Sequence, residues 1–100
     1  MKLKVATLLH THDLLLRSWA DELFNTLAEK KSQLFTLDFS DIDFVSRTFA
    51  HEYLKQKKAF NLPIKEKNMK ENVEQMFRIA AQLPNKKDIA ISGVIVVQNL

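Results

Sequence analysis

The hydrophobic pattern changes its period between residues 34 and 54, and this change constrains the fold more than any other feature of the chain. Residues 34–39 have the aromatic and apolar content of a buried strand, and a polar turn follows at 41–43. Apolar residues then recur at helical spacing, namely Phe49, Ala50, Tyr53 and Leu54. The sequence therefore predicts a strand that passes through a turn into a helix from Ser46 to about Lys58, as in α/β domains.

The start of this helix carries two hydroxyl groups and a cation. Ser46, Arg47 and Thr48 lie where a helix presents unpaired backbone N–H groups, which favour anions. Ser46 and Thr48 are therefore candidate phosphoacceptors. The alternative is that Ser46 only caps the helix, because serine is a common residue at that position for purely structural reasons.

The flanking segments supply further elements. We expect a strand over Lys2 to Leu9, a helix from Asp13 to Glu29, and a brief strand near Leu62 and Ile64. The stripe of the first helix is expected to contain Leu15, Leu16, Trp19, Ala20, Leu23, Phe24 and Leu27. The prediction is one α/β domain over residues 1–100, in which a small mixed β-sheet packs with about three helices.

The last third of the chain predicts one more helix and one more strand. Asn68 and Glu71 have the spacing of a capping box, and an apolar seam follows them. The seam consists of Met69, Val73, Met76, Ala80 and Leu83. It is too short for a coiled coil, so we expect it to pack on this domain's own sheet. Residues 89–97 predict a strand that either completes the sheet or pairs with a second copy in a homodimer.

Composition limits the possible classes of protein. A chain of 100 residues with 46% hydrophobic content suffices for one core. It contains no apolar run near the roughly 20 residues that cross a bilayer, and no signal-peptide cleavage pattern, so we expect a cytoplasmic protein without membrane association. The absence of cysteine excludes disulfides and thiolate metal sites.

Few residues suggest catalysis. His10, His12 and Asp13 lack a third metal ligand at characteristic spacing, and solvent-facing turn histidines explain them better. Gly93 is the sole glycine, so no Gly-rich phosphate loop is present, and no serine has the pattern of a nucleophile elbow. We therefore expect neither an enzyme, nor a cofactor, nor a metal site.

Positive charge is concentrated in one part of the chain. The formal net charge is +3, and the segment from 55 to 70 is rich in lysine. Its lysines are Lys55, Lys57, Lys58, Lys65, Lys67 and Lys70. Such a segment is usually solvated surface, but it also supports an alternative function, in which the domain binds a polyanion or nucleic acid.

Residues 37–54, with the sequence LDFSDIDFVSRTFAHEYL, resemble the central segment of STAS-like domains, the group that includes bacterial anti-sigma factor antagonists. The similarity is greatest to a short, uncharacterised STAS-like family and extends over about residues 1–83. The matching positions are Asp38, Phe39, Ser40, Phe44, Val45, Ser46, Phe49 and Ala50.

The resemblance implies a regulatory, non-catalytic module. In the anti-sigma antagonists this junction docks on a histidine-kinase-like ATPase, and phosphorylation of a serine at the helix start breaks the complex. Arg47 occupies the position of that serine here, and Phe49 replaces the glycine that follows the hydroxyl pair. The implied partner is such an ATPase or an anti-sigma factor. The implied partner-binding or regulatory positions are Asp38, Ser40, Asp43, Ser46, Arg47, Thr48 and His51.

Overall fold

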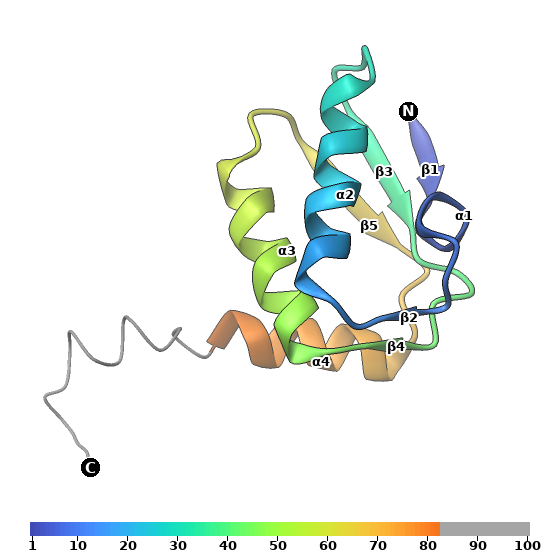
Figure 1. Ribbon diagram of the computed structural model, residues 1–100, viewed down its shortest axis with the longest axis vertical. Helices are drawn as coiled ribbons and strands as arrows, with labels where there is room; N and C mark the ends of the chain where they lie inside the picture. The colour runs from blue at the N-terminus through green and yellow to red at the C-terminus, as the bar shows by residue number, and fades with distance from the viewer. Residues whose placement is uncertain (83–100) are drawn as a thin grey trace, which may run out of the picture.

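A computed structural model describes residues 1–82, and it confirms the α/β class (Figure 1). Four helices and five short strands alternate along the chain. In order they are β1 (Lys2–Lys4), α1 (Val5–Leu9), β2 (Asp13–Leu14), α2 (Arg17–Glu29), β3 (Phe35–Asp38), β4 (Phe44–Val45), α3 (Arg47–Ala59), β5 (Ile64–Lys67) and α4 (Glu71–Gln82). The predicted strand over 89–97, and any pairing through it, lies outside the described residues.

The strands form two separate parallel sheets, where the sequence had suggested one mixed sheet. The larger sheet has the order β1-β3-β5, and the smaller consists of β2 and β4. Within residues 1–82 every strand pair is parallel. In the larger sheet this follows because each connection between neighbouring strands includes a helix that returns the chain to the same edge.

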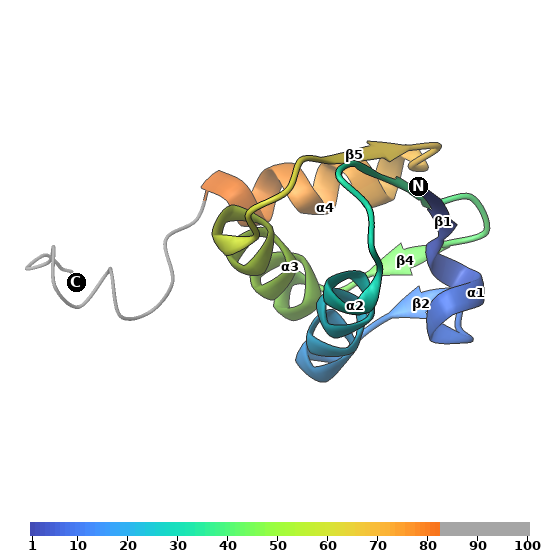
Figure 2. The same cartoon turned by 90° about the horizontal axis from the view of Figure 1, so that it is seen from above.

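The two crossover helices lie on one face of the larger sheet. The strand order advances in one direction, from β1 through β3 to β5, and right-handed crossovers then place α2 and α3 on the same side. Figure 2 shows both helices together on that side of the strands. Phe35, Leu37 and Ile64 point towards the helices and are buried. The intervening residues of β3 and β5 point away from them.

The core between sheet and helices is centred on Tyr53. Its ring lies 5.4 Å from the ring of Phe24 and 5.2 Å from that of Phe77, so α3 contacts both α2 and α4 through aromatic side chains. The buried hydroxyl donates a hydrogen bond of 2.6 Å to Glu66 on β5. Burial raises the pKa of Tyr53, and the Glu66 carboxylate raises it further.

The first strand is shorter than predicted. Only Lys2–Lys4 is extended, and the apolar run Val5–Leu9 forms α1 instead. Val5, Ala6 and Leu9 are buried while Thr7 is exposed. That pattern has helical spacing, and a strand with period two would have required Thr7 to face the same side as Val5 and Leu9. His10 follows in the left-handed conformation, with φ 55°, and ends the helix.

The predicted first helix begins four residues too early. Asp13 and Leu14 form β2 through their pairing with Phe44 and Val45, and α2 begins at Arg17. Because the partner strand lies about thirty residues further along the chain, local periodicity gave no sign of this pairing. The helix starting near Ser46 is confirmed, with α3 spanning Arg47–Ala59.

The final described helix packs on the core as predicted but begins differently. Of the predicted seam, Val73 and Ala80 are buried and Met76 is half-buried, whereas Met69 precedes the helix and Leu83 lies outside the described residues. Phe77, which the predicted seam omitted, is also buried. The predicted capping box is wrong, because α4 begins at Glu71 and Asn68 lies two residues before its N-cap position. Asn68 has φ 62° and donates its side-chain amide to Asp38, 3.0 Å away.

Candidate functional site

The junction between β4 and α3 is held in place by β2. The backbone N–H of Ser46 donates to the carbonyl of Leu14 at 2.8 Å, continuing the parallel register of Asp13 with Phe44 and Leu14 with Val45. Leu14 and Val45 are buried beneath this ribbon. The start of α3 therefore has a fixed position relative to the residues that precede α2.

Ser46 is the N-cap of α3, and its hydroxyl makes two hydrogen bonds. Its oxygen accepts from the backbone N–H of Phe49 at 3.0 Å, and its O–H donates to the carbonyl of Leu15 at 2.7 Å. The capping interpretation is thus confirmed. A phosphate on this oxygen would remove the proton that Leu15 accepts, so the hydroxyl of Ser46 is committed to the fold.

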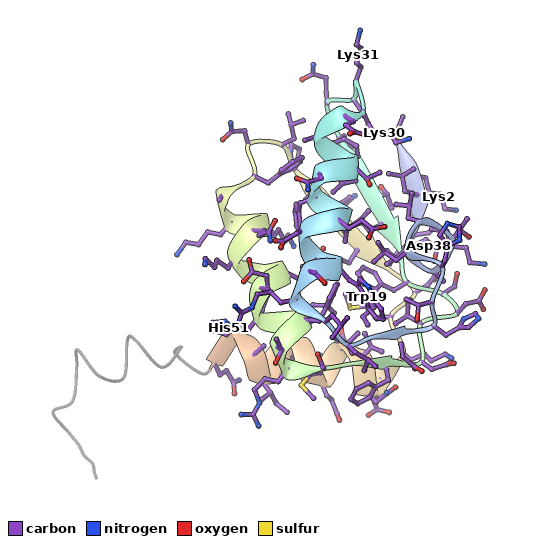
Figure 3. All side chains as sticks on the ribbon, in the orientation of Figure 1. Lys2, Trp19, Lys30, Lys31, Asp38 and His51 are labelled. Carbon is purple, nitrogen blue, oxygen red and sulfur yellow. The ribbon has the colours of Figure 1, made fainter. Side chains whose placement is uncertain are left out.

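Arg47 and Thr48 have a different environment. Both are exposed in the first turn of α3, at the end of the helix where the peptide dipoles favour negative charge. His51, one turn further along the same face, is half-buried, and Figure 3 shows its place on α3. Of the two predicted phosphoacceptors, Thr48 is the accessible one.

Three large apolar side chains are exposed beside this helix start. Leu15, Leu16 and Phe44 retain 45%, 53% and 44% of their accessible surface. The register places Phe44 opposite Asp13, so Leu15, two residues further, is its diagonal neighbour on the outer face of the ribbon. We name Leu15, Leu16, Phe44, Arg47 and Thr48 together the corner patch.

The sequence prediction assigned Leu15 and Leu16 to the buried stripe of a helix, and this was wrong. Both precede α2, whose first residue is Arg17. The run of three leucines at 14–16 carried a signal against that assignment, because three consecutive residues span too wide an arc to lie on one helical stripe. In the ribbon, Leu14 points inward and Leu15 outward.

Asp38 and Ser40 lie at the carboxyl end of β3 and interact with each other. The Asp38 carboxylate accepts from the backbone N–H of Ser40 at 2.9 Å and from the Asn68 amide at 3.0 Å. The Ser40 backbone bond, the Asn68 bond and a bond from the Ser40 hydroxyl lower the pKa of Asp38 to about 2. Asp38 therefore joins the ends of β3 and β5.

Asp41 and Asp43 connect the turn to the rest of the domain. Lys4 forms an ion pair of 2.7 Å with Asp41 and holds the pKa of that carboxyl below its usual value. Asp43 is exposed and pairs with Lys70, while its backbone carbonyl accepts from Asn72 at 2.8 Å. The exposed His12 lies in a turn, with its ring Nδ1 2.8 Å from the Asp41 carbonyl.

The lysine-rich segment does not stay together in space. Lys57 pairs with Glu66 at 2.7 Å and Lys70 pairs with Asp43. Lys55 and Lys58 are exposed on α3, on the side of the sheet that the helices cover. The remaining two, Lys65 and Lys67, project from the opposite face of β5.

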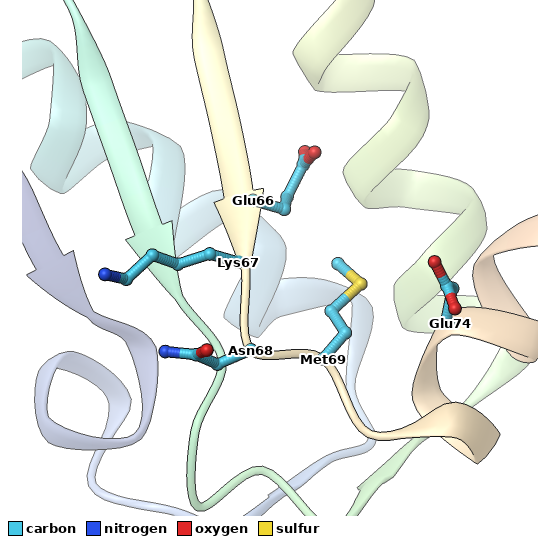
Figure 4. A pocket seen from close by; sticks show the side chains of 5 residues that line it. All are labelled: Glu66, Lys67, Asn68, Met69 and Glu74. Carbon is cyan, nitrogen blue, oxygen red and sulfur yellow. The ribbon is translucent and has the colours of Figure 1, made fainter.

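An open hollow of about 330 Å³ lies between β5 and the start of α4. Figure 4 shows the side chains of Glu66, Lys67, Asn68, Met69 and Glu74 around it. The Glu66 carboxylate beside the hollow already bonds to the Tyr53 hydroxyl and to Lys57.

Within residues 1–82, no group of three or more His, Asp or Glu side chains is placed to hold a metal ion. No helix in this range is long and apolar enough to cross a membrane.

Comparison of the chain with protein-family models, with curated proteins and with solved structures gave no match. The α/β class follows from the structure itself, whereas membership of the STAS-like group stays a prediction from residues 37–54. Among the surfaces of the described residues, the corner patch combines exposed apolar area with an accessible hydroxyl.

Proposed function

We propose that this protein is a non-catalytic regulatory module that docks on a signalling protein through the corner patch. The observation that carries the proposal is the exposure of Leu15, Leu16 and Phe44 next to Arg47 and Thr48. The resemblance to anti-sigma factor antagonists favours a histidine-kinase-like ATPase or an anti-sigma factor as the partner.

The composition of this surface suits a protein partner. Interfaces combine an apolar centre with a polar rim, and the patch has three apolar side chains with Arg47 beside them. Asp13 in β2 and Asp43, which directly precedes β4, are exposed beside the patch, so the rim carries both signs of charge. A partner surface with an apolar centre and a rim of both positive and negative charges would match it.

The patch is also built to bind without rearrangement. The parallel ribbon fixes Leu15 and Phe44, and the cap made by Ser46 fixes the first turn of α3. A surface that is already ordered loses less conformational entropy on binding. A phosphate on Thr48 would add about 1.5 to 2 negative charges in the interface and weaken docking, while the helix start and Arg47 would tolerate it in the free protein.

A photo-crosslinking residue placed at position 47, in cells that express the native partner, tests the proposal. We expect a discrete covalent adduct with a protein that has an ATPase-type kinase domain or is an anti-sigma factor. The control places the same residue at the exposed Lys31, beyond the far end of α2 (Figure 3), where no such adduct should form. Equal adducts from both positions would refute docking at the corner.

Two leucines of nearly equal exposure provide matched variants for the same experiment. Leu15 is 45% exposed in the corner patch, and Leu34 is 44% exposed before β3, at the opposite end of the sheet. Leu15→Ser should lower the adduct yield from position 47 at least about tenfold, as expected for an interface anchor, and Leu34→Ser should leave it unchanged. Thr48→Glu should lower the yield without shifting the melting temperature.

A further inference from the structure

One face of the larger sheet is not covered by any described helix. The crossover helices α2 and α3 both lie on the other face, as Figure 2 shows. Parallel sheets are usually covered on both faces, so an open face in such a sheet is unusual. The alternation along the three strands identifies the residues that point outward, which are Lys2, Lys4, Thr36, Asp38, Lys65 and Lys67.

The strand register arranges these residues in two rows across the sheet. Lys2, Thr36 and Lys65 form one row, because Thr36 pairs with both lysines. In the second row Asp38 pairs with Lys4 on one side and Lys67 on the other. Neighbouring strands lie about 4.8 Å apart, so the two backbones that carry lysine in each row are separated by about 10 Å.

Some of the charges on this face already have partners. Lys4 pairs with Asp41 at the end of the sheet, and Asp38 is held by Ser40 and Asn68. In the part of the chain that the structure describes, no ion pair is formed by Lys2, Lys65 or Lys67. We name these three lysines, together with Thr36, the lysine face.

Two of the cations, Lys2 and Lys67, influence each other's charge. Lys67 extends from β5 across β3 in the direction of β1 (Figure 4). The positive charge of Lys2 lowers the pKa of Lys67, because two ammonium groups repel each other, whereas the Asp38 carboxylate raises it. An anion placed over the centre of the sheet would relieve this repulsion.

We propose that the lysine face binds the phosphate backbone of double-stranded nucleic acid without reading its sequence. Lysine ammonium groups and a hydroxyl such as that of Thr36 are common donors to phosphate oxygens. The two rows present cations on both outer strands, so the face can contact more than one phosphate of a duplex laid across it. This surface differs from the corner patch in residues and in ligand.

The outward positions of the three strands carry no aromatic or apolar side chains, which argues against other kinds of partner. No aromatic side chain lies at an outward position of β1, β3 or β5, so bases of a single strand would have nothing on which to stack. No outward position of these strands is apolar either. The face therefore has no apolar centre for a protein interface and no side chains that would insert into a membrane surface.

The number of phosphate contacts predicts how steeply duplex binding should weaken with added salt. Three lysines that each neutralise one phosphate predict a slope of about −2.7 for the logarithm of the association constant against that of salt concentration. A fourfold rise in salt, from about 50 to about 200 mM, should then weaken binding about 40-fold.

Fluorescence anisotropy with a labelled blunt DNA duplex of mixed sequence, titrated with the full chain, tests this surface. The double variant Lys65→Gln with Lys67→Gln should lose about 100-fold or more in affinity at about 50 mM salt, and its slope should fall towards about −0.9. The control is Lys55→Gln with Lys58→Gln, which removes the same charge from α3. It should keep most of the affinity and the slope of the native chain.

The remaining outcomes are also decisive. Equal losses in the two double variants would show that net charge alone attracts the duplex, and would overturn the proposal. Tighter binding to vesicles that contain anionic lipid than to the duplex would overturn it in favour of a membrane surface. Lys2→Gln provides a second test from another strand, with an expected loss of about tenfold, and a melting curve for each variant confirms that it is folded.

Discussion

Ser46 and Thr48 lie two residues apart at the start of α3, yet their hydroxyl groups have different surroundings. That of Ser46 bonds to the N–H of Phe49 and to the carbonyl of Leu15, whereas Thr48 is exposed. A hydroxyl that already donates and accepts within the fold contributes to stability, and an exposed one is free to change its bonding. We therefore expect Ser46 to contribute to stability, whereas Thr48 is available for the proposed regulation.

This difference predicts opposite effects on stability. Ser46→Ala should lower the free energy of unfolding by about 1 to 2 kcal/mol, because it removes the cap and leaves the Leu15 carbonyl without its donor. Thr48→Ala, the control, should change it by less than about 0.5 kcal/mol. Urea unfolding followed by circular dichroism measures both, and equal effects would show that Ser46 is not the cap.

Asp38 should make stability depend on acidic pH. Hydrogen bonds from Ser40 and Asn68 lower its pKa in the folded state to about 2, below the value of 3.8 for an unperturbed aspartate. The folded carboxylate binds its proton less readily than the unfolded one, so its contribution is present above about pH 4 and is lost as the pH falls towards 2.

Asp38→Asn provides the measurement, because the variant has no carboxyl to titrate at this position. Between about pH 5 and 2, the native chain should lose more stability than the variant does in urea titrations. Parallel curves for the two proteins would show that the carboxylate is not held by these bonds.

At the scale of elements, the helices with a full apolar stripe were predictable and the shortest elements were not. The sequence predicts α3 and the seam of α4 because Phe49, Tyr53, Val73 and Ala80 repeat over several turns. β2 has two residues and exists only through its pairing with β4, which is distant in sequence. α1 has five residues, too few for periodicity to separate it from a strand.

In the candidate site, the part that depends on local periodicity was predictable, and the part that depends on strand pairing was not. The Ser46 cap follows from its place before an amphipathic run, and the structure confirms it. The exposed Leu15 and the inward-pointing Leu14 depend on β2, so local periodicity assigned them wrongly. The lysines were recognised as a segment of sequence, but strand register, which periodicity alone does not give, combines Lys65 and Lys67 with Lys2.

At the scale of the whole described domain, the two surfaces arise from two different features of the topology. The order β1-β3-β5 places the crossover helices on one face, which leaves the other face to the outward lysines. The chain that leaves β3 forms the ribbon with β2 before entering α3, and this ribbon carries the corner patch beyond the carboxyl edge of the sheet. The two surfaces thus share no side chain and lie on different parts of the fold.

Because the surfaces are separate, changes in one should not affect binding at the other. A double variant, Leu15→Ser with Phe44→Ser, removes exposed apolar area from the ribbon and no charge, so it should bind the DNA duplex with the affinity and salt slope of the native chain. Conversely, Lys65→Gln with Lys67→Gln should leave the adduct yield from position 47 unchanged. Anisotropy and cross-linking on the same four proteins, including the Lys55→Gln with Lys58→Gln control, measure both effects. If the leucine and phenylalanine substitutions weakened duplex binding by more than about threefold, the two ligands would have to share one surface, and the division of roles between corner and sheet would be wrong.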